Sequence, residues 1–169
     1  MDRFKQFANS WKTVGVTSRV KWQQSNTIDR LNSQLIKALV EKYGEEVMAI
    51  ISDITFEIGL EDGKKICENL NLESGTTKGC VMPLETVSLL SGIDSEVCGS
   101  GKDQRSTSIR IRGCMFSGMF DGMNPDIKSR ACESYSLGLV RAVNDKAELK
   151  VSRKCCATNK FCEFVVSLR

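Results

Sequence analysis

Apolar residues in the first half of the chain recur every three or four positions, the spacing of one face of an α-helix. This pattern begins near Asn26 and stops at Gly44, then resumes from Val47 to Ile66. The polar stretch ENLNLESGTTKG follows and predicts a loop. Because proline suits the first helical position, we expect a third, short helix from Pro83 to Leu90.

The pattern changes after about residue 92, where the stretch STSIRIRGC alternates apolar and polar residues with period two. Such alternation predicts a strand, here ending near Gly113, with a second short strand at 96–98. Asn124-Pro125-Asp126 combines a capping side chain, an N-terminal proline and an acid, so it predicts the start of a helix that ends near residue 144.

The last segments, AELKVSRKC and KFCEFVVSLR, read as two strands joined by the turn CATNK, which predicts a β-hairpin. The order of elements is therefore helices first, then strand, helix and hairpin. This order predicts an α+β fold in which helices pack on an antiparallel sheet. We expect a single domain over 1–169, with a helical half at 1–92 and a strand–helix–hairpin half at 93–169.

Composition narrows the class of protein. The net charge of +3 is too small to indicate nucleic-acid binding. No run of about 18 apolar residues exists to span a membrane, and MDRFKQFANS lacks the apolar core of a signal peptide. The expected compartment is the cytoplasm, where thiols stay reduced. The eight cysteines are then expected to serve in metal binding or thiol chemistry rather than in a disulfide framework.

Histidine is absent from the sequence. Its absence excludes Ser-His-Asp and Cys-His catalysis, haem held by histidine and histidine-ligated zinc within this chain. Any metal ligands must come chiefly from cysteine and carboxylate side chains.

The predicted hairpin places its cysteines by strand alternation. Cys155 shares a face with Leu149 and Val151, and Cys162 shares a face with Phe164, so both are expected on the inner face near the turn. Cys156 is expected to point outward or into the turn.

Two further cysteines bear on this site. Cys132 lies on the helix that precedes the hairpin and is expected to approach its open end. Cys114 reaches the same place only if Gly113 bends the chain. Each cysteine alone could be ordinary packing, but their convergence favours a bound zinc ion or iron–sulfur cluster, the centres that thiolates select.

The tail ACESYSLGLVRAVNDKAELKVSRKCCATNKFCEFVVSL and the segment RIRGC carry a resemblance to known families. They resemble the C-terminal half of vinyl-reductase-type sensor domains and, equally, of L-2-amino-thiazoline-4-carboxylic acid hydrolases. The shared features are a helix, a strand ending in Cys, a short polar turn and a closing strand that begins with Cys. The resemblance covers roughly residues 105–168.

In phenol-sensing members of the vinyl-reductase group, zinc is held by three cysteines and one glutamate of these elements. Carried over, the resemblance implies Cys132, Cys155 (or Cys156) and Cys162 as ligands. The glutamate has no counterpart, since its place falls near Ser152 or Arg153. Cys156 and Cys114 are the candidates to replace it, and such an all-cysteine site suits a [4Fe-4S] cluster as well as zinc.

A small-molecule site is also expected between the sheet and the N-terminal helices. Met and Phe side chains in the stretch MFSGMFDGMN are candidates to line it, although such residues also fill ordinary cores. Arg110 and Arg112 could receive a carboxylate, or could simply form a solvated face. The lining candidates are Met115, Phe116, Met119, Phe120 and Met123.

The hydrolase resemblance implies an alternative function, the opening of a cyclic C–N bond. Cys114 would be the nucleophile, Asp121 or Glu133 the base, and Arg112 the carboxylate anchor. Without histidine, the pKa of Cys114 would have to be lowered by Arg110 or Arg112. A third alternative function is that of an iron–sulfur accessory subunit of a larger complex. The family resemblance also implies that the chain forms a homodimer.

Overall fold

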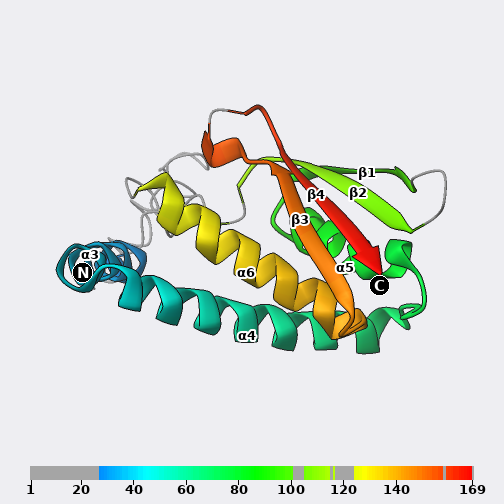
Figure 1. Ribbon diagram of the computed structural model, residues 1–169, viewed down its shortest axis with the longest axis horizontal. Helices are drawn as coiled ribbons and strands as arrows, with labels where there is room; N and C mark the ends of the chain where they lie inside the picture. The colour runs from blue at the N-terminus through cyan, green and yellow to red at the C-terminus, as the bar shows by residue number, and fades with distance from the viewer. Residues whose placement is uncertain (1–26, 101–104, 115, 117–123, 158, 169) are drawn as a thin grey trace, which may run out of the picture.

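The computed structural model describes residues 27–100, 105–114, 116, 124–157 and 159–168 (Figure 1). The described elements are the helices α3 (Thr27–Tyr43), α4 (Glu45–Leu70), α5 (Thr77–Leu90) and α6 (Pro125–Val143), the strands β1 (Asp94–Ser100), β2 (Ser106–Arg112), β3 (Ala147–Arg153) and β4 (Cys162–Leu168), and the short 3-10 turn η1 (Cys155–Ala157). The predicted α+β class is confirmed.

The four strands form one antiparallel sheet in the order β1-β2-β4-β3. In β2, Ile109 and Ile111 are buried while Arg110 and Arg112 are exposed, so the alternation read from the sequence is the real division between the two faces. Ile109 stands opposite Phe164 of β4, which puts the central pair of the sheet over the core.

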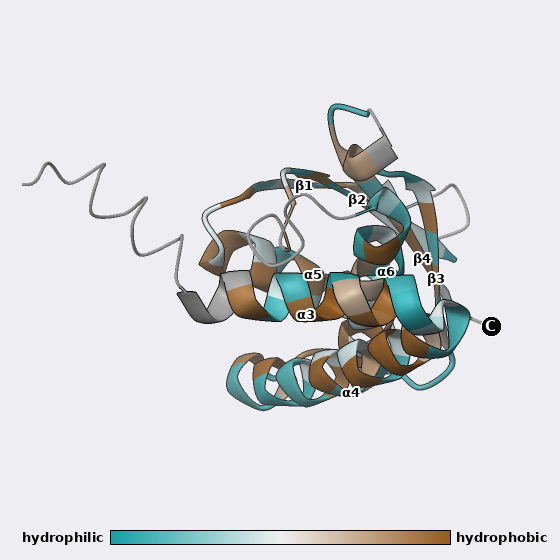
Figure 2. Cartoon of the chain, turned by 90° about the vertical axis from the view of Figure 1, so that its left-hand side faces the viewer, coloured by the Kyte–Doolittle hydropathy of each residue, from teal (hydrophilic) through white to brown (hydrophobic). Residues whose placement is uncertain are grey.

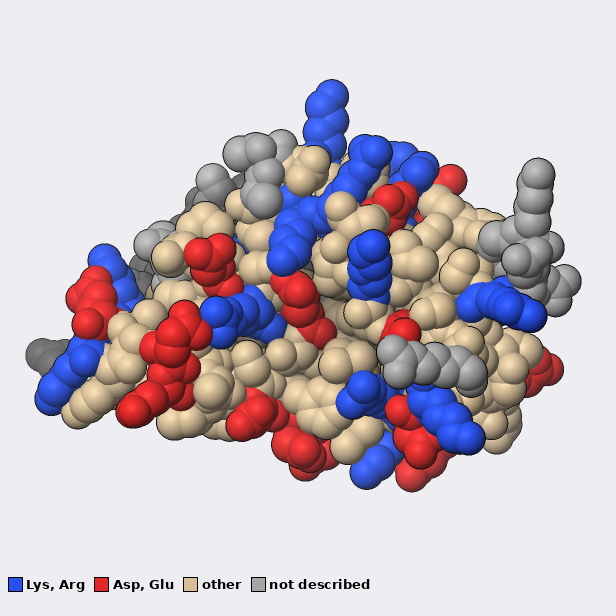
Figure 3. Space-filling model, in the orientation of Figure 1, with Lys and Arg blue, Asp and Glu red and all other residues tan. Residues whose placement is uncertain are grey.

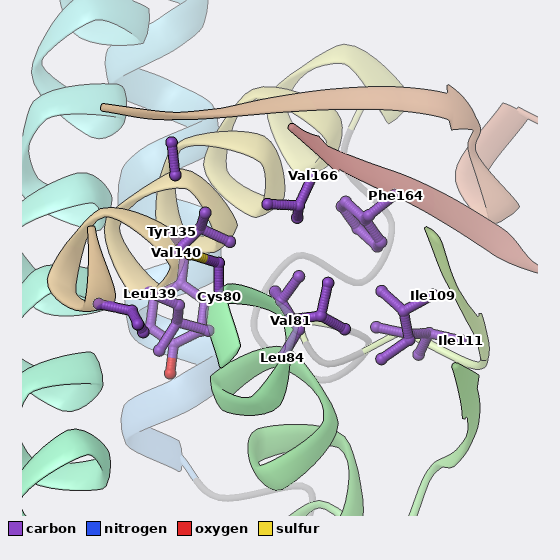
Figure 4. Close-up of a cluster of buried hydrophobic side chains, with 12 residues drawn as sticks. Cys80, Val81, Leu84, Ile109, Ile111, Tyr135, Leu139, Val140, Phe164 and Val166 are labelled. Carbon is purple, nitrogen blue, oxygen red and sulfur yellow. The ribbon is translucent and has the colours of Figure 1, made fainter. Parts of the chain in front are cut away.

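Helices α5 and α6 pack on the inner face of the sheet, and α4 lies along α6 on the side away from the strands (Figure 1). The core between these layers is closely packed around Leu84, Ile109, Leu139, Phe164 and Val166, which are essentially inaccessible to solvent (Figure 4). Within the described residues, no helix has the length and apolarity needed to cross a bilayer.

The contact between α4 and α6 depends on glycine. A Cβ atom built at Gly59 would lie 2.1 Å from the carbonyl oxygen of Tyr135, and one at Gly138 would lie 2.2 Å from that of Phe56. These distances are shorter than any real contact of a Cβ atom, so the two backbones touch only because the side chains are absent.

Helix α5 begins at Thr77, earlier than the predicted Pro83. The Thr76 hydroxyl accepts a hydrogen bond from the Gly79 N–H at 3.0 Å and so caps the first turn. Pro83 is buried inside the helix, where it removes one backbone hydrogen bond without ending the element. Thr76 and Thr77 in GTTKG therefore form the start of α5. The polar composition of this stretch predicted a loop at these residues.

Cys80 on α5 makes the stability of the core depend on pH. Burial, with Cys67 as the second cause, raises the pKa of the Cys80 thiol from 9.0 to about 11. A group that holds its proton more tightly when folded stabilises fully below its unfolded pKa and loses this contribution as pH rises through the folded value. We therefore expect the free energy of unfolding to fall between pH 9 and about 11.

Urea denaturation on both sides of this window tests the expectation in Cys80→Ala, which should show a weaker fall than wild type. Cys98→Ala, outside the core cluster, is the matched control and should keep the wild-type fall. An equal fall in Cys80→Ala and wild type would contradict the role of this thiol.

Candidate functional site

Five thiols that interact electrostatically with one another lie near the place where η1 contacts α6. The Cys132 thiol is coupled electrostatically to Cys162, Cys114 and Cys156, and the Cys162 thiol to Cys155, Cys156 and Cys114. We call this group, Cys114, Cys132, Cys155, Cys156 and Cys162, the thiol cluster. Figure 1 shows the turn η1 at the end of the β3–β4 hairpin, above the start of α6.

The hairpin end brings three of these thiols together through a local turn. Strand β3 stops at Arg153, and the 3-10 turn η1 starts at Cys155. The Cys155 N–H donates to the Cys162 Sγ at 3.2 Å. Cys156 lies in η1, one of the two places expected for it, and acts electrostatically on Cys132 and Cys162.

Cys114 joins the cluster because the chain turns after β2. Its pKa is raised in part by Cys156 and Cys155, which places these thiols within electrostatic reach. Gly113 lies against Ile93, where a Cβ atom would be 2.8 Å from the Ile93 Cγ2. Gly113 itself lies in a bend directly after β2, as the sequence required for this approach.

Burial is the first cause that raises the pKa of the Cys114, Cys132 and Cys162 thiols. The opposing causes are hydrogen bonds that favour the thiolate: the Phe116 backbone acts on Cys114 and the Cys155 backbone on Cys162. With burial dominant, these thiols are protonated at neutral pH until something else competes for the sulfur.

The Ser136 hydroxyl is a third hydrogen-bonding group that favours the thiolate form of a cysteine in the cluster, here Cys132. Ser136 is fully buried, and its hydroxyl has no hydrogen-bond partner of good geometry among the described residues. It stands one turn beyond Cys132 on α6 and lies close enough to lower the pKa of that thiol. A thiolate at Cys132 would give this orphaned hydroxyl an acceptor.

Charged side chains border the cluster. The Glu133 carboxylate contacts the Lys154 Nζ and accepts from the Ser129 hydroxyl, both at 2.5 Å. The Lys128 ammonium lowers the pKa of Cys114. The carboxylate of Glu133, one of the two predicted bases, is thus engaged by Ser129 of the same helix and by Lys154, the residue that precedes η1.

The two predicted carboxylate anchors lie elsewhere. Arg110 pairs with Glu163 at 2.8 Å, and Arg112 with Glu96 at 3.8 Å, on the exposed outer face of the sheet. Arg110 also lies 5.3 Å from the centre of the Phe161 ring. The structure therefore separates both arginines from the inner face, where Ile109 and Ile111 are buried.

The predicted apolar lining is described at one position. Phe116 packs edge-on against Tyr135 with 5.4 Å between ring centres and contacts the core. Met115, Met119, Phe120, Met123 and the predicted base Asp121 lie outside the described residues. A hollow of about 500 Å³ near the start of α5, bordered by Thr76, Lys78 and Arg105, is away from the thiol cluster.

Among the described residues, no group of three or more Cys, Asp or Glu side chains lies in positions that could hold a metal ion.

No protein-family model and no curated protein matches the sequence. Among solved structures, a trafficking protein particle complex subunit 3 from Naegleria fowleri, covalently bound to palmitic acid, matches with a TM-score of 0.60 and 14% identity over 88% of this chain and 96% of that chain. The phenol-responsive sensory domain of the transcription activator PoxR, with phenol, matches with a TM-score of 0.55 and 13% identity over 85% of this chain and 75% of that chain. Neither name mentions a vinyl reductase or thiazoline hydrolase, so that resemblance stays a prediction. At these identities the chain shares with both structures a fold, and a fold alone.

Proposed function

We propose that the thiol cluster binds a thiophilic metal centre, zinc or an iron–sulfur cluster, within a ligand-binding or accessory domain. The observation that carries the proposal is the convergence of five thiols from four separate parts of the chain: the end of β2, helix α6, the turn η1 and the start of β4. Packing alone explains a single buried cysteine, but it does not explain why five cysteines lie close to one another.

The chemistry of the donors fits such a centre. Thiolate ligands select zinc and iron–sulfur clusters, and backbone N–H groups or hydroxyls beside the ligands stabilise the bound thiolates. Cys132, Cys155 and Cys162 are the first three ligands proposed, Cys114 is the fourth, and Cys156 is the alternate. Bound metal would supply a four-way link that holds the hairpin to α6.

The wider role proposed is that of a sensor or an accessory subunit. One protein with this fold is a phenol-responsive sensory domain and the other is a subunit of a complex. These roles support binding of a small molecule or a partner protein over catalysis.

The hydrolase alternative is supported less well by the positions of its residues. Burial raises the pKa of Cys114, the proposed nucleophile, whereas the reaction needs it lowered. Arg112 lies on the outer face with Glu96, and Glu133 is engaged with Lys154. We therefore place the metal-binding proposal first.

Metal analysis and a visible spectrum of protein purified without oxygen test the proposal. We expect about one zinc ion per chain, or the brown absorption and the iron and sulfide of a cluster. Cys132→Ser and Cys162→Ser should lose most of the metal, while Cys98→Ser on β1 should keep it. Metal-free protein from both zinc-rich and iron-rich growth, or full retention in both cluster variants, would contradict the proposal.

Ser136 allows a more selective test. Ser136→Ala is expected to weaken metal affinity by about 10-fold or more, the usual effect of removing a hydrogen bond to a metal ligand, with unchanged stoichiometry. The control is Ser88→Ala, because Ser88 is equally buried but donates to the Leu84 carbonyl oxygen. Competition with a chelating dye measures both, and equal affinities would remove the assigned role of Ser136.

A further inference from the structure

Two thiols lie next to each other at the end of the β3–β4 hairpin. Cys155 follows β3 and Cys162 begins β4, just beyond the last strand pair, in which Arg153 stands opposite Glu163. The Cys155 nitrogen lies 3.2 Å from the Cys162 Sγ. Because an N–Cα bond is about 1.46 Å long, the Cys162 sulfur is less than about 5 Å from the Cys155 Cα.

This spacing suits a disulfide bond. In a disulfide, only three bonds separate the sulfur of one cysteine from the Cα of the other, namely S–S, S–Cβ and Cβ–Cα. A separation below about 5 Å is within the reach of these bonds. The Cys155 sulfur can therefore bond to the Cys162 sulfur while the pairing of β3 with β4 stays as it is.

The end of the hairpin can be reached from solvent. Cys155 and Cys162 are both partly exposed. In two views at right angles, the turn η1 lies at the upper edge of the molecule (Figure 1 and Figure 2). Cys80, in contrast, is fully buried in the core. A small oxidant can therefore meet the two hairpin thiols without any opening of the core.

Basic side chains surround this end of the hairpin. Arg153, Lys154 and Lys160 flank the turn, and Figure 3 shows basic side chains gathered on the upper part of the face turned to the viewer. Contacts of Arg153 with Glu163 and of Lys154 with Glu133 offset part of this charge. Reactive cysteines, unlike cysteines that only pack, are found in partly exposed and electropositive surroundings. The surroundings of the hairpin end therefore favour thiol chemistry.

The loop that such a bond would close is short. Six residues separate Cys155 from Cys162. Stabilisation by a disulfide grows with the length of the loop that it closes, so this bond would add less to the fold than a bridge between distant segments. Exposed disulfides are also more easily reduced than buried structural ones. The bond therefore fits a reversible modification better than a permanent structural link.

We propose that Cys155 and Cys162 form a reversible disulfide when the chain meets hydrogen peroxide. One of the two sulfurs takes an oxygen atom from the peroxide and becomes a sulfenic acid, and the rest of the peroxide leaves as water. The second thiol then attacks this sulfur, so that the S–S bond forms, the S–O bond breaks and a second water leaves. Two electrons pass from the two thiols to the peroxide, and a dithiol reductant restores both thiols by giving up two electrons.

The same modification would control the metal site. This consequence rests on the proposed function, in which Cys155 and Cys162 are both metal ligands. Only a thiolate sulfur serves as such a ligand, so the chain cannot hold the disulfide and the four-ligand centre at the same time. Peroxide would then release the metal and remove the link between the hairpin and α6.

Peptide mapping of the full chain tests the disulfide without any need of metal. Trypsin cleaves after Lys154 and Lys160, which places Cys155 in the peptide CCATNK and Cys162 in the peptide FCEFVVSLR. After treatment with a chelator and then hydrogen peroxide, we expect the loss of two of the eight free thiols and a cross-link between these two peptides in mass spectrometry. Dithiothreitol should restore all the thiols. A chain that keeps its thiols, or that joins other cysteines instead, would overturn the proposal.

Two variants identify the partner within CCATNK. Cys155→Ser should lose the cross-link, while Cys156→Ser is the matched control and should form it as wild type does. Persistence of the cross-link in Cys155→Ser, or its absence in Cys156→Ser, would contradict the pairing of Cys155 with Cys162. Fragmentation of the cross-linked wild-type peptides locates the bond without any substitution.

The zinc-loaded chain tests the consequence for the metal. Hydrogen peroxide should release one zinc ion for each disulfide formed, with the zinc followed by a chelating dye and the disulfide by peptide mapping. A disulfide that forms while zinc stays bound, or zinc release without the disulfide, would remove the link between the two events. A chain that binds no metal would contradict the proposed function alone, because the disulfide is mapped in the absence of metal.

Discussion

Gly59→Ala is expected to destabilise the protein by about 2 kcal/mol or more, although alanine is the better helix former by about 1 kcal/mol. The added Cβ would lie 2.1 Å from the Tyr135 carbonyl oxygen and 2.9 Å from its carbon. Both atoms belong to the backbone of α6, so no side chain can rotate away. The α4–α6 contact must open instead, and the packing lost along it outweighs the gain in helix propensity.

Urea denaturation measures the change, and Gly138→Ala on the facing helix should give a similar loss, since its Cβ would meet the Phe56 carbonyl oxygen. Gly75→Ala is the control, because nothing lies within 4 Å of a Cβ at that position. The control should stay within about 0.5 kcal/mol of wild type. A stable Gly59→Ala protein would mean that the two helices are farther apart than the structure shows.

The fold was predictable where local signals and burial agreed. Asn124 caps α6 through a hydrogen bond from the Asp126 N–H, as the Asn-Pro-Asp sequence predicted. The strict alternation in β2 predicted its buried and exposed faces. The close approach at Gly59 and Gly138 was not predictable, because a glycine inside a helical pattern usually signals weakness and reveals its contact only when the partner helix is placed.

The candidate site was predictable in part. The predicted hairpin brings Cys155 beside Cys162, because the Cys155 N–H donates to the Cys162 Sγ, while the role of these cysteines and Cys132 as metal ligands stays a prediction. Cys156 lies in the turn, one of the two places expected for it, but the 3-10 form of that turn was not predictable because turns of three residues leave little periodic signal. The sequence did hold the signal for Ser136, four residues after Cys132 on the same helix, but its role depends on burial that only the structure gives.

For Arg110 and Arg112, the sequence predicted which face of the sheet they occupy but not which side chains they pair with. Arg110 and Arg112 alternate with buried isoleucines, so their outward direction could be read from the sequence. What the sequence could not give was the register that sets Arg110 opposite Glu163 and Glu96 near Arg112. Pairing between strands decides whether such a charge is free to bind a ligand.

Zinc is expected to stabilise the folded chain by about 4 kcal/mol when its free concentration is a thousand times the dissociation constant. The gain should depend on pH because zinc takes thiolates and releases their protons. As pH falls, the thiols regain protons and the stabilisation by zinc is lost. Without metal the free energy of unfolding depends on pH in the opposite direction. The pKa values of Cys114, Cys132 and Cys162 are raised above 9.0 in the folded chain. Their contribution to the free energy of unfolding is therefore fully present below pH 9 and is lost as pH rises beyond it.

Denaturation with zinc and with a chelator, each over a range of pH, separates the two effects. The two stability curves should converge at acidic pH and lie farthest apart at neutral to mildly alkaline pH. In Cys132→Ser the gain from zinc should largely disappear, while Cys98→Ser should keep it. A gain from zinc that persists in Cys132→Ser, or that does not decline as pH falls, would show that the metal binds outside the thiol cluster, because only thiol ligands must lose protons with such high pKa values before they can bind.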